Sequence, residues 1–179
     1  MRVTESRVYF LNGPLGNWYK VEGGILVPKK FNCVEEKDFR LPTSEHVFMY
    51  LKALCFNDIV SAKKIMEVKS PGEAKKIGRQ VSGFNEKTWL EAREEAMQIA
   101  VYLKGKSDPD FLKFLCSDEF RNHSFVEANP NDRIWSCGYS IDDHSGCDQP
   151  EECWPGLNLL GKILTDLRDK YLEKMNSKK

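Results

Sequence analysis

Residues 41–56 read LPTSEHVFMYLKALCF, and this stretch decides how the rest of the chain is interpreted. Thr43 or Ser44 can cap a helix there, which is predicted to run to about Phe56. The helical pattern continues to about residue 117. Further helix starts are predicted at Asn57 or Asp58, at Pro71 for a helix that ends near Gly78, near Asn85, and at Asp108 with Pro109.

Two charged residues share one face of this first helix. Glu45 and Lys52 lie seven residues apart and are separated by about 10 Å along the axis. Apolar side chains beside a carboxylate and an ammonium shift both pKa values, so the two can form a reactive pair. A solvated charged face, with Phe48 in the core, accounts for the same spacing.

The ends of the chain carry the predicted strands and one more long helix. Strands are expected at 7–12, 22–31, 124–129 and 133–140, the last two on either side of the turn NPND. A helix is expected from Leu157 to Met175. The fold class is therefore α+β, a mainly helical single domain over residues 1–179 with a small antiparallel sheet.

Composition excludes several classes of protein. With 41% hydrophobic and 11% aromatic residues, the chain is not disordered. Its zero net charge gives no global attraction to nucleic acid or acidic membranes. We expect a soluble, cytoplasmic protein, because the sequence shows neither a signal peptide nor an apolar run of the ~18 residues that a membrane span needs. The six cysteines are accordingly expected to be reduced thiols.

Two further stretches contain residues that can bind or react. In VEANPNDRIWSCG, the carboxylate of Asp132 follows a turn and Trp135 can stack on a planar ligand, although an Asx-turn and a core tryptophan fit equally well. In WPGLNLLG, the helix start at Asn158 can offer N–H groups to an anion, or it can be only a helix start. Between Asp58 and Arg79 a net three positive charges can attract phosphate.

A metal site is a weaker alternative. Cys137, His144, Cys147 and Cys153 are zinc-binding residue types, but the close cysteine pair of most structural zinc sites is missing. The same stretch, residues 139–153, is rich in Asp and Glu and is interpreted as an acidic insertion loop, where magnesium is no better supported than zinc. We therefore expect neither a metal nor any other cofactor.

The chain resembles the YbiA/NADAR family, a superfamily of N-glycosidases and ADP-ribosyl-guanine glycohydrolases. Five blocks carry the resemblance, and they follow one another in the order seen in the family over about residues 10 to 168. They are GPLGNWY, LPTSEHVFMYLKALCF, AKKIGRQVSGFNEKTW, FVEANPNDRIWSCG and WPGLNLLGKILTDLR. Gly16 and Trp18 depart from the usual Ser-Asn-Phe-Tyr, and Ser136 stands where the family usually has Gly.

The resemblance implies a YbiA-like fold with one pocket and a metal-independent hydrolase. The implied catalytic residues are Glu45, Lys52 and Asp132. The implied substrate-binding residues, three of them tryptophans suited to sandwich a flat base, are Asn17, Trp18, His46, Arg79, Trp89, Trp135 and Asn158.

Such residues suit the cleavage of a ribose C1–N bond. A carboxylate stabilises the positive charge that develops on the sugar, and a second group protonates the leaving base. Lys52 can either bind phosphate as a cation or attack the ring-opened C1 as an amine. The favoured substrate is ADP-ribose on guanine in nucleic acid; the alternatives are phosphoribosylaminopyrimidine intermediates of riboflavin biosynthesis, or non-catalytic binding of ADP-ribose or a nucleotide. No obligate protein partner is inferred.

Overall fold

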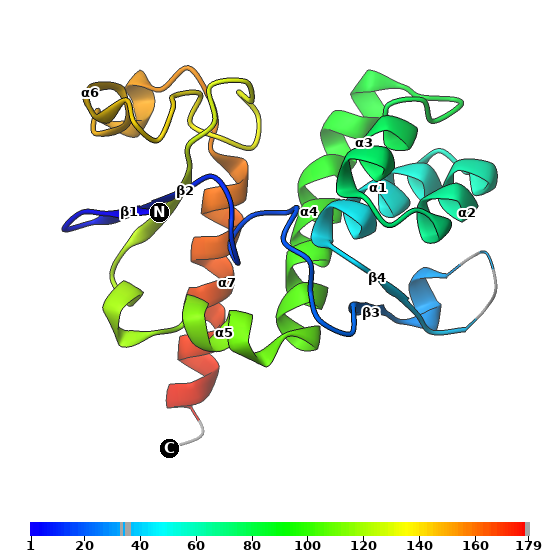
Figure 1. Ribbon diagram of the computed structural model, residues 1–179, viewed down its shortest axis with the longest axis horizontal. Coiled ribbons are helices and arrows are strands. Elements are labelled where there is room, and N and C mark those ends of the chain that lie inside the picture. Colours follow the sequence, from blue (N-terminus) through cyan, green and yellow to red (C-terminus); the bar gives the residue numbers. More distant parts are fainter. Residues whose placement is uncertain (33, 35–36, 178–179) are drawn as a thin grey trace. The chain divides into compact units, whose positions relative to one another are not determined.

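The computed structural model describes residues 1–32, 34 and 37–177 (Figure 1). Its α-helices are α1 (Ser44–Cys55), α2 (Ile59–Glu67), α3 (Pro71–Gly78), α4 (Glu86–Ser107), α5 (Pro109–Leu115), α6 (His144–Cys147) and α7 (Leu159–Asn176). Three short 3₁₀ helices are η1 (Lys29–Phe31), η2 (Asp118–Phe120) and η3 (Glu151–Cys153). The strands are β1 (Arg2–Val3), β2 (Arg7–Phe10), β3 (Ile25–Val27), β4 (Phe39–Leu41) and β5 (Ser124–Glu127).

The strands form two small sheets. One has the order β1-β2-β5 and the other pairs β3 with β4. The predicted fold class, mainly helical α+β with a small sheet contributed by distant parts of the chain, is confirmed. The pairing differs in one respect: β1–β2 and β3–β4 are antiparallel, but β2 and β5 run parallel, with Val8 opposite Phe125. A parallel pair needs a long crossover, and here the helices α1 to α5 lie between the two strands in the chain.

The helix starts follow the capping residues read from the sequence. Thr43 accepts a hydrogen bond from the His46 N–H at the start of α1, and Asn85 accepts one from Thr88 N at 3.0 Å at the start of α4. Asp58 caps α2 in the same way. Pro71 occupies the first turn of α3, where its missing N–H costs nothing.

The described residues cluster into two compact units, which we name by their place in the chain. The central unit comprises Asn17–Pro109, and the terminal unit comprises Met1–Gly16 and Asp110–Lys179. Together they cover the range that the sequence assigns to one domain, and the number of domains stays a prediction.

In the central unit, α1 is the buried element. It packs against α2, α3 and α4, and Val47, Tyr50 and Ala53 are fully buried. A Cβ at Gly78 would overlap the Met49 sulfur, so a glycine at the end of α3 permits its close approach to α1.

In the terminal unit, α7 packs against β5, which pairs with β2. Buried residues of the two strands and of α7 form its core. A separate cluster of buried residues, with Tyr139 and Ile141 packed against it, lies where the predicted acidic loop meets β2 and β5; its members are Tyr9, Val126, Ala128, Cys137, Cys147 and Trp154. The acidic stretch is therefore anchored through apolar side chains and includes the short helix α6.

The prediction of a strand at residues 133–140 is wrong. The carbonyl groups of residues 133–137 accept hydrogen bonds from the backbone N–H groups of residues 156–160. These carbonyls are engaged by the segment that leads into α7, so this stretch is an irregular support for the helix start. Within the described residues, no helix is both long and apolar enough to cross a lipid bilayer.

Candidate active site

Glu45 lies in the first turn of α1, beside the chain entering the central unit. Glu45 is only 5% exposed, and its backbone N–H donates a hydrogen bond to the Asn17 carbonyl at 3.0 Å. The Ser44 hydroxyl lies 3.3 Å from that carbonyl and 3.2 Å from the Asn17 side-chain oxygen. Asn17 is itself buried, with its amide nitrogen 3.3 Å from the Met97 sulfur. Asn17 and Glu45, which the resemblance names separately as a binding and a catalytic residue, are thus neighbours.

His46 is fully buried beneath the same turn. Its Nδ1 lies 2.8 Å from the Thr43 hydroxyl oxygen. Burial lowers the pKa of His46, and the Val68 backbone and the charge of Glu73 oppose that shift only in part. A neutral imidazole without exposed surface fits a role in supporting the Glu45 turn.

Lys52 lies on α1 against aromatic side chains. Its Nζ is 4.6 Å from the centroid of the Phe84 ring and 5.3 Å from that of Trp89. Burial, and secondarily the charge of Arg79, lowers the pKa of Lys52 below its ordinary value. An amine with a lowered pKa is more often uncharged at neutral pH, which is the form that attacks a carbonyl carbon.

Trp89 is fixed by other rings of the central unit. Its ring centroid lies 5.3 Å from that of Phe48 on α1 and 6.4 Å from that of Phe56. It is half-buried, so part of its surface remains available to a ligand. The predicted reactive lysine and the predicted stacking tryptophan are therefore neighbours on one surface.

Trp18 and Arg79 lie at the exposed surface of the central unit. Trp18 is 53% exposed, and the Lys75 Nζ lies 6.0 Å from its ring centroid. Arg79 caps the end of α3 and is exposed. Both side chains are accessible to an anionic or aromatic ligand.

Asp132, in the terminal unit, makes the Asx-turn that its position allows. One carboxylate oxygen, Oδ1, accepts hydrogen bonds from the Ile134 and Trp135 N–H groups, each at 2.9 Å. Among the described residues, its second oxygen has no hydrogen-bond partner. The turn therefore uses one half of the carboxylate and leaves the other for a ligand, and Trp135 follows it as a half-buried side chain.

Asn158 is used by the backbone around it. It adopts a left-handed conformation before α7, with Oδ1 accepting from Glu127 N at 3.0 Å and Nδ2 donating to the Phe125 carbonyl at 3.1 Å. The N–H groups of residues 156–160 donate to the carbonyls of residues 133–137. The N–H groups of residues 156–160 therefore already have acceptors, which favours the alternative that this stretch is only a helix start, and Asn158 as a substrate-binding residue stays a prediction.

The cysteines do not form the zinc site considered above. Among the described residues, no three His, Cys, Asp or Glu side chains are grouped as metal ligands. Cys137 and Cys147 are buried, whereas His144 and Cys153 are exposed. Desolvation, with the neighbouring Cys137 thiol, raises the pKa of Cys147 to about 12, so this thiol stays protonated. Cys33 lies outside the described residues.

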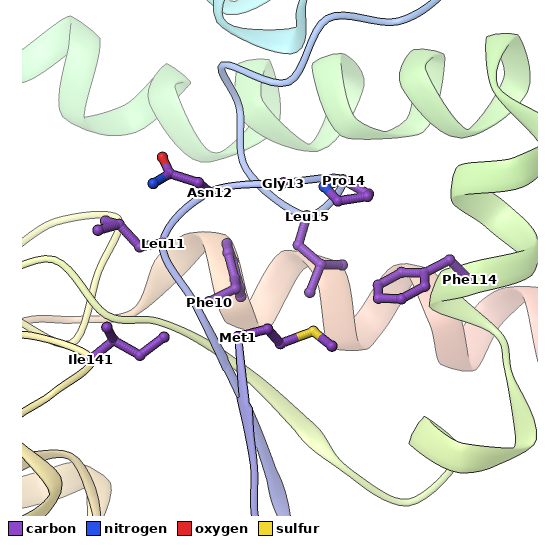
Figure 2. Close-up of a pocket in the computed structure, with 9 residues that line it drawn as sticks. All are labelled: Met1, Phe10, Leu11, Asn12, Gly13, Pro14, Leu15, Phe114 and Ile141. Atoms are coloured by element: carbon purple, nitrogen blue, oxygen red, sulfur yellow. The ribbon is translucent and has the colours of Figure 1, made fainter.

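A cavity of about 510 Å³ lies in the terminal unit. Figure 2 shows Met1, Phe10, Leu15 and Phe114 gathered around it, with the Asn12 amide pointing away from these four side chains. Within the described part of the chain, none of the side chains that line it is charged, and none is a residue that the sequence predicts for the site. It is unsuited to a ribose phosphate, which needs cationic or hydrogen-bonding partners.

The predicted site residues thus divide between the two units. The central unit contains Asn17, Trp18, Glu45, His46, Lys52, Arg79 and Trp89, and the terminal unit contains Asp132, Trp135 and Asn158. That the two sets act on one substrate stays a prediction. Sequence reasoning missed Phe84, whose only signal was an aromatic residue after Gly83 in a turn, and it identified Asp58 as a helix cap alone.

Comparison with known proteins gives a family and a fold. A sequence model of the NADAR domain matches residues 9–172. N-glycosidase R617 of Acanthamoeba polyphaga mimivirus is 37% identical over 127 residues, covering 71% of this chain and 72% of that protein. N-glycosidase YbiA of Escherichia coli (strain K12) is 30% identical over 128 residues, covering 72% and 69%. The NMR structure of E. coli YbiA superposes with a TM-score of 0.68 at 25% identity, covering 97% of this chain and 90% of that one.

Proposed function

This chain belongs to the NADAR domain family, and on that premise we propose that it is an N-glycosidase that removes ADP-ribose from guanine bases of nucleic acid. The observation that carries the proposal is on α1. A buried carboxylate, Glu45, and a partly desolvated amine, Lys52, occupy the same helix beside exposed aromatic and cationic side chains. The relatives R617 and YbiA are both named N-glycosidases.

The carboxylates supply charge stabilisation and proton transfer. As the C1–N bond lengthens, positive charge develops on the ribose, and an ionised Glu45 stabilises it. A water molecule adds its oxygen to C1, its proton passes to a carboxylate, and the leaving base nitrogen takes a proton from the second acid. Asp132 is the proposed second acid, because one of its oxygens is not used by the local turn.

Lys52 offers a covalent variant of the same reaction. After the ribose ring opens, the neutral amine forms a bond to C1 and the base leaves with the proton that the lysine loses. Water then hydrolyses the imine, which releases the sugar aldehyde and restores the amine. The lowered pKa of Lys52 supports this role, whereas a role as a phosphate-binding cation requires the charged form.

The preference for nucleic acid is supported by the surface of the central unit. Lys63, Lys64, Lys69, Lys76 and Arg79 are exposed on or beside α2 and α3. Exposed Trp18 offers a face on which a base can stack. A modified guanine would have to be single-stranded or extruded from a duplex to react.

Product release tests the proposal. We would incubate the protein with a single-stranded oligonucleotide bearing ADP-ribosyl guanine and, separately, with a phosphoribosylaminopyrimidine, and identify the products by mass spectrometry. Release of ADP-ribose with restoration of guanine supports the proposal. Cleavage of the pyrimidine compound alone would assign the alternative substrate, and saturable binding without cleavage would replace an enzyme by a binding module.

Two controls accompany this assay. Excess EDTA is expected to leave the rate unchanged, because the proposed steps use only protein side chains and water. Borohydride added during turnover is expected to trap a lysine adduct at Lys52 if the amine attacks C1; absence of the adduct in an active sample would leave Lys52 as a phosphate contact.

A further inference from the structure

Lys52 has two aromatic neighbours that differ in how they are held. Trp89 belongs to the long helix α4 and contacts Phe48 and Phe56. Phe84 belongs to the loop between α3 and α4, is 48% exposed, and contacts Phe56 with ring centroids 5.3 Å apart. Its position over the Lys52 Nζ therefore depends on how that loop is fixed.

Asp58 fixes the loop. Its Oδ1 accepts from Ser61 N at 2.9 Å, which caps α2, and its Oδ2 accepts from the Ser61 hydroxyl at 2.7 Å. The same Oδ2 accepts from Ser82 N at 2.8 Å, a residue far along the chain and only two positions before Phe84. These hydrogen bonds hold the pKa of Asp58 far below its ordinary value, so the carboxylate is ionised at physiological pH.

We infer that Asp58 is a positioning residue for Lys52, because its hydrogen bond to Ser82 keeps the Phe84 ring against the lysine amine. We call this hydrogen bond the Asp58–Ser82 tether. The chemical role of Lys52 rests on the proposed function, but the tether and its effect on Phe84 do not. Asp58, which caps α2, therefore also holds a loop of the candidate site in place.

The expected consequence is loss of geometry at the amine. Without the tether, the loop is free to move Phe84 away, and water replaces one of the two rings that confine Nζ. Reactions that depend on a positioned nucleophile are sensitive to displacements of about 1 Å. Trp89 and Arg79 would remain, so the effect is partial.

Asp58→Asn separates the tether from the cap. Asn is as good an N-cap as Asp, so its Oδ1 can still accept from Ser61 N. Its side-chain NH₂ would face the Ser82 N–H, where two donors cannot pair. Asp58→Ser is the second variant, because Ser also caps helices but is too short to serve both Ser61 and Ser82. Phe84→Ala reports complete loss of the ring.

NMR on uniformly ¹³C-labelled protein gives the readout. Protons above an aromatic face resonate upfield, so the Lys52 Cε protons should lie upfield of those of exposed Lys63. Phe84→Ala is expected to reduce this shift, and both Asp58 variants to reduce it most of the way to the Phe84→Ala value. Faster hydrogen exchange at Ser82 N–H should accompany the change. Lys52 resonances identical to those of the parent in folded Asp58→Asn and Asp58→Ser would overturn the inference.

Measurements of kcat on the same variants provide a second test of the inference. Asp58→Asn and Phe84→Ala are each expected to lower kcat about tenfold. The kcat of the double variant should be no lower than that of the less active single variant, because both changes remove the same contact. Losses that multiply in the double variant would contradict the inference. If the parent cleaves neither substrate, the proposed function fails while the NMR comparison still decides whether the tether holds Phe84.

Discussion

Two regions that the sequence marks as functional are built in opposite ways. On α1, Lys52 lies against two aromatic rings, and burial together with the positive charge of Arg79 lowers its pKa. At the start of α7, Asn158 has its side-chain oxygen and nitrogen engaged by the backbone of β5. The first region is the proposed reactive one, whereas the second joins a strand to a helix.

The hydrogen bonds around each residue separate a structural role from a chemical one. A residue whose polar atoms are all used by nearby backbone contributes to folding, and removing it leaves buried groups unpaired. A titratable group whose pKa is shifted by partial burial is instead a candidate for chemistry. Asp132 lies between these cases, with one oxygen used by a turn.

The largest expected effect is a loss of turnover when Glu45 on α1 is changed. Glu45→Gln should lower kcat about 10²-fold or more, because a neutral amide cannot stabilise the cationic sugar. Circular dichroism and thermal unfolding should match the parent closely. Glu67→Gln, an exposed residue at the end of α2, is the matched control and should retain full activity. Equal rates for Glu45→Gln and the parent would remove Glu45 from the mechanism.

The next largest effect is a loss of stability when Gly161 on α7 is changed. Gly161→Ala should lower the free energy of unfolding by about 2–3 kcal/mol, because the added Cβ would overlap the Phe125 carbonyl oxygen. Lys162→Ala, an exposed neighbour, should change it by less than about 0.5 kcal/mol. Urea unfolding measures both, and equal stability of the two variants would show that α7 and β5 are not closely joined at this point.

A smaller effect on turnover is expected at Asp132, where a turn and a proposed catalytic role share one carboxylate. Asp132→Asn keeps an oxygen that can accept from Ile134 and Trp135, so the turn should survive while kcat falls about tenfold, because an amide cannot give its proton to the leaving base. Asp132→Ala should show the same catalytic loss together with about 1 kcal/mol of destabilisation. Full activity in a stable Asp132→Asn variant would assign Asp132 to the turn alone.

The smallest effect concerns pH. The charge of Arg79 contributes to the lowered pKa of Lys52, so Arg79→Gln should raise that pKa and move the rising limb of the pH–rate profile to higher pH. At pH 7 the rate should fall about twofold, because charges this exposed interact weakly. Arg79→Lys should leave the profile in place. An unmoved profile in Arg79→Gln would favour a cationic role for Lys52.

Local signals predicted much of the fold. Thr43, Asp58 and Asn85 each act within a few residues, and the helices begin where these caps place them. The segment at 133–140 could not be predicted in this way, because its apolar composition suits a strand while its carbonyls bind N–H groups of residues 156–160. The parallel pairing of β2 with β5 likewise depends on chain crossing, which composition does not encode.

The candidate site was predictable where it depends on helix spacing. Seven residues separate Glu45 from Lys52, and both lie on α1 as expected. The contacts around Lys52 depend on Phe84 and on the Asp58–Ser82 tether, which join parts of the chain that no local pattern links. The resemblance to the family named Asn158 as a binding residue, and only its hydrogen bonds indicate a structural role.

Turnover per folded molecule and the free energy of unfolding, measured side by side on two variants, separate catalysis on α1 from support at the start of α7. Glu45→Gln should lose about 10²-fold in turnover at unchanged stability. Asn158→Ala should lose about 2 kcal/mol of stability and keep near-parental turnover in its folded fraction. A stable, inactive Asn158→Ala together with an active Glu45→Gln would contradict the account, because it would place the chemistry at the start of α7 and not on α1.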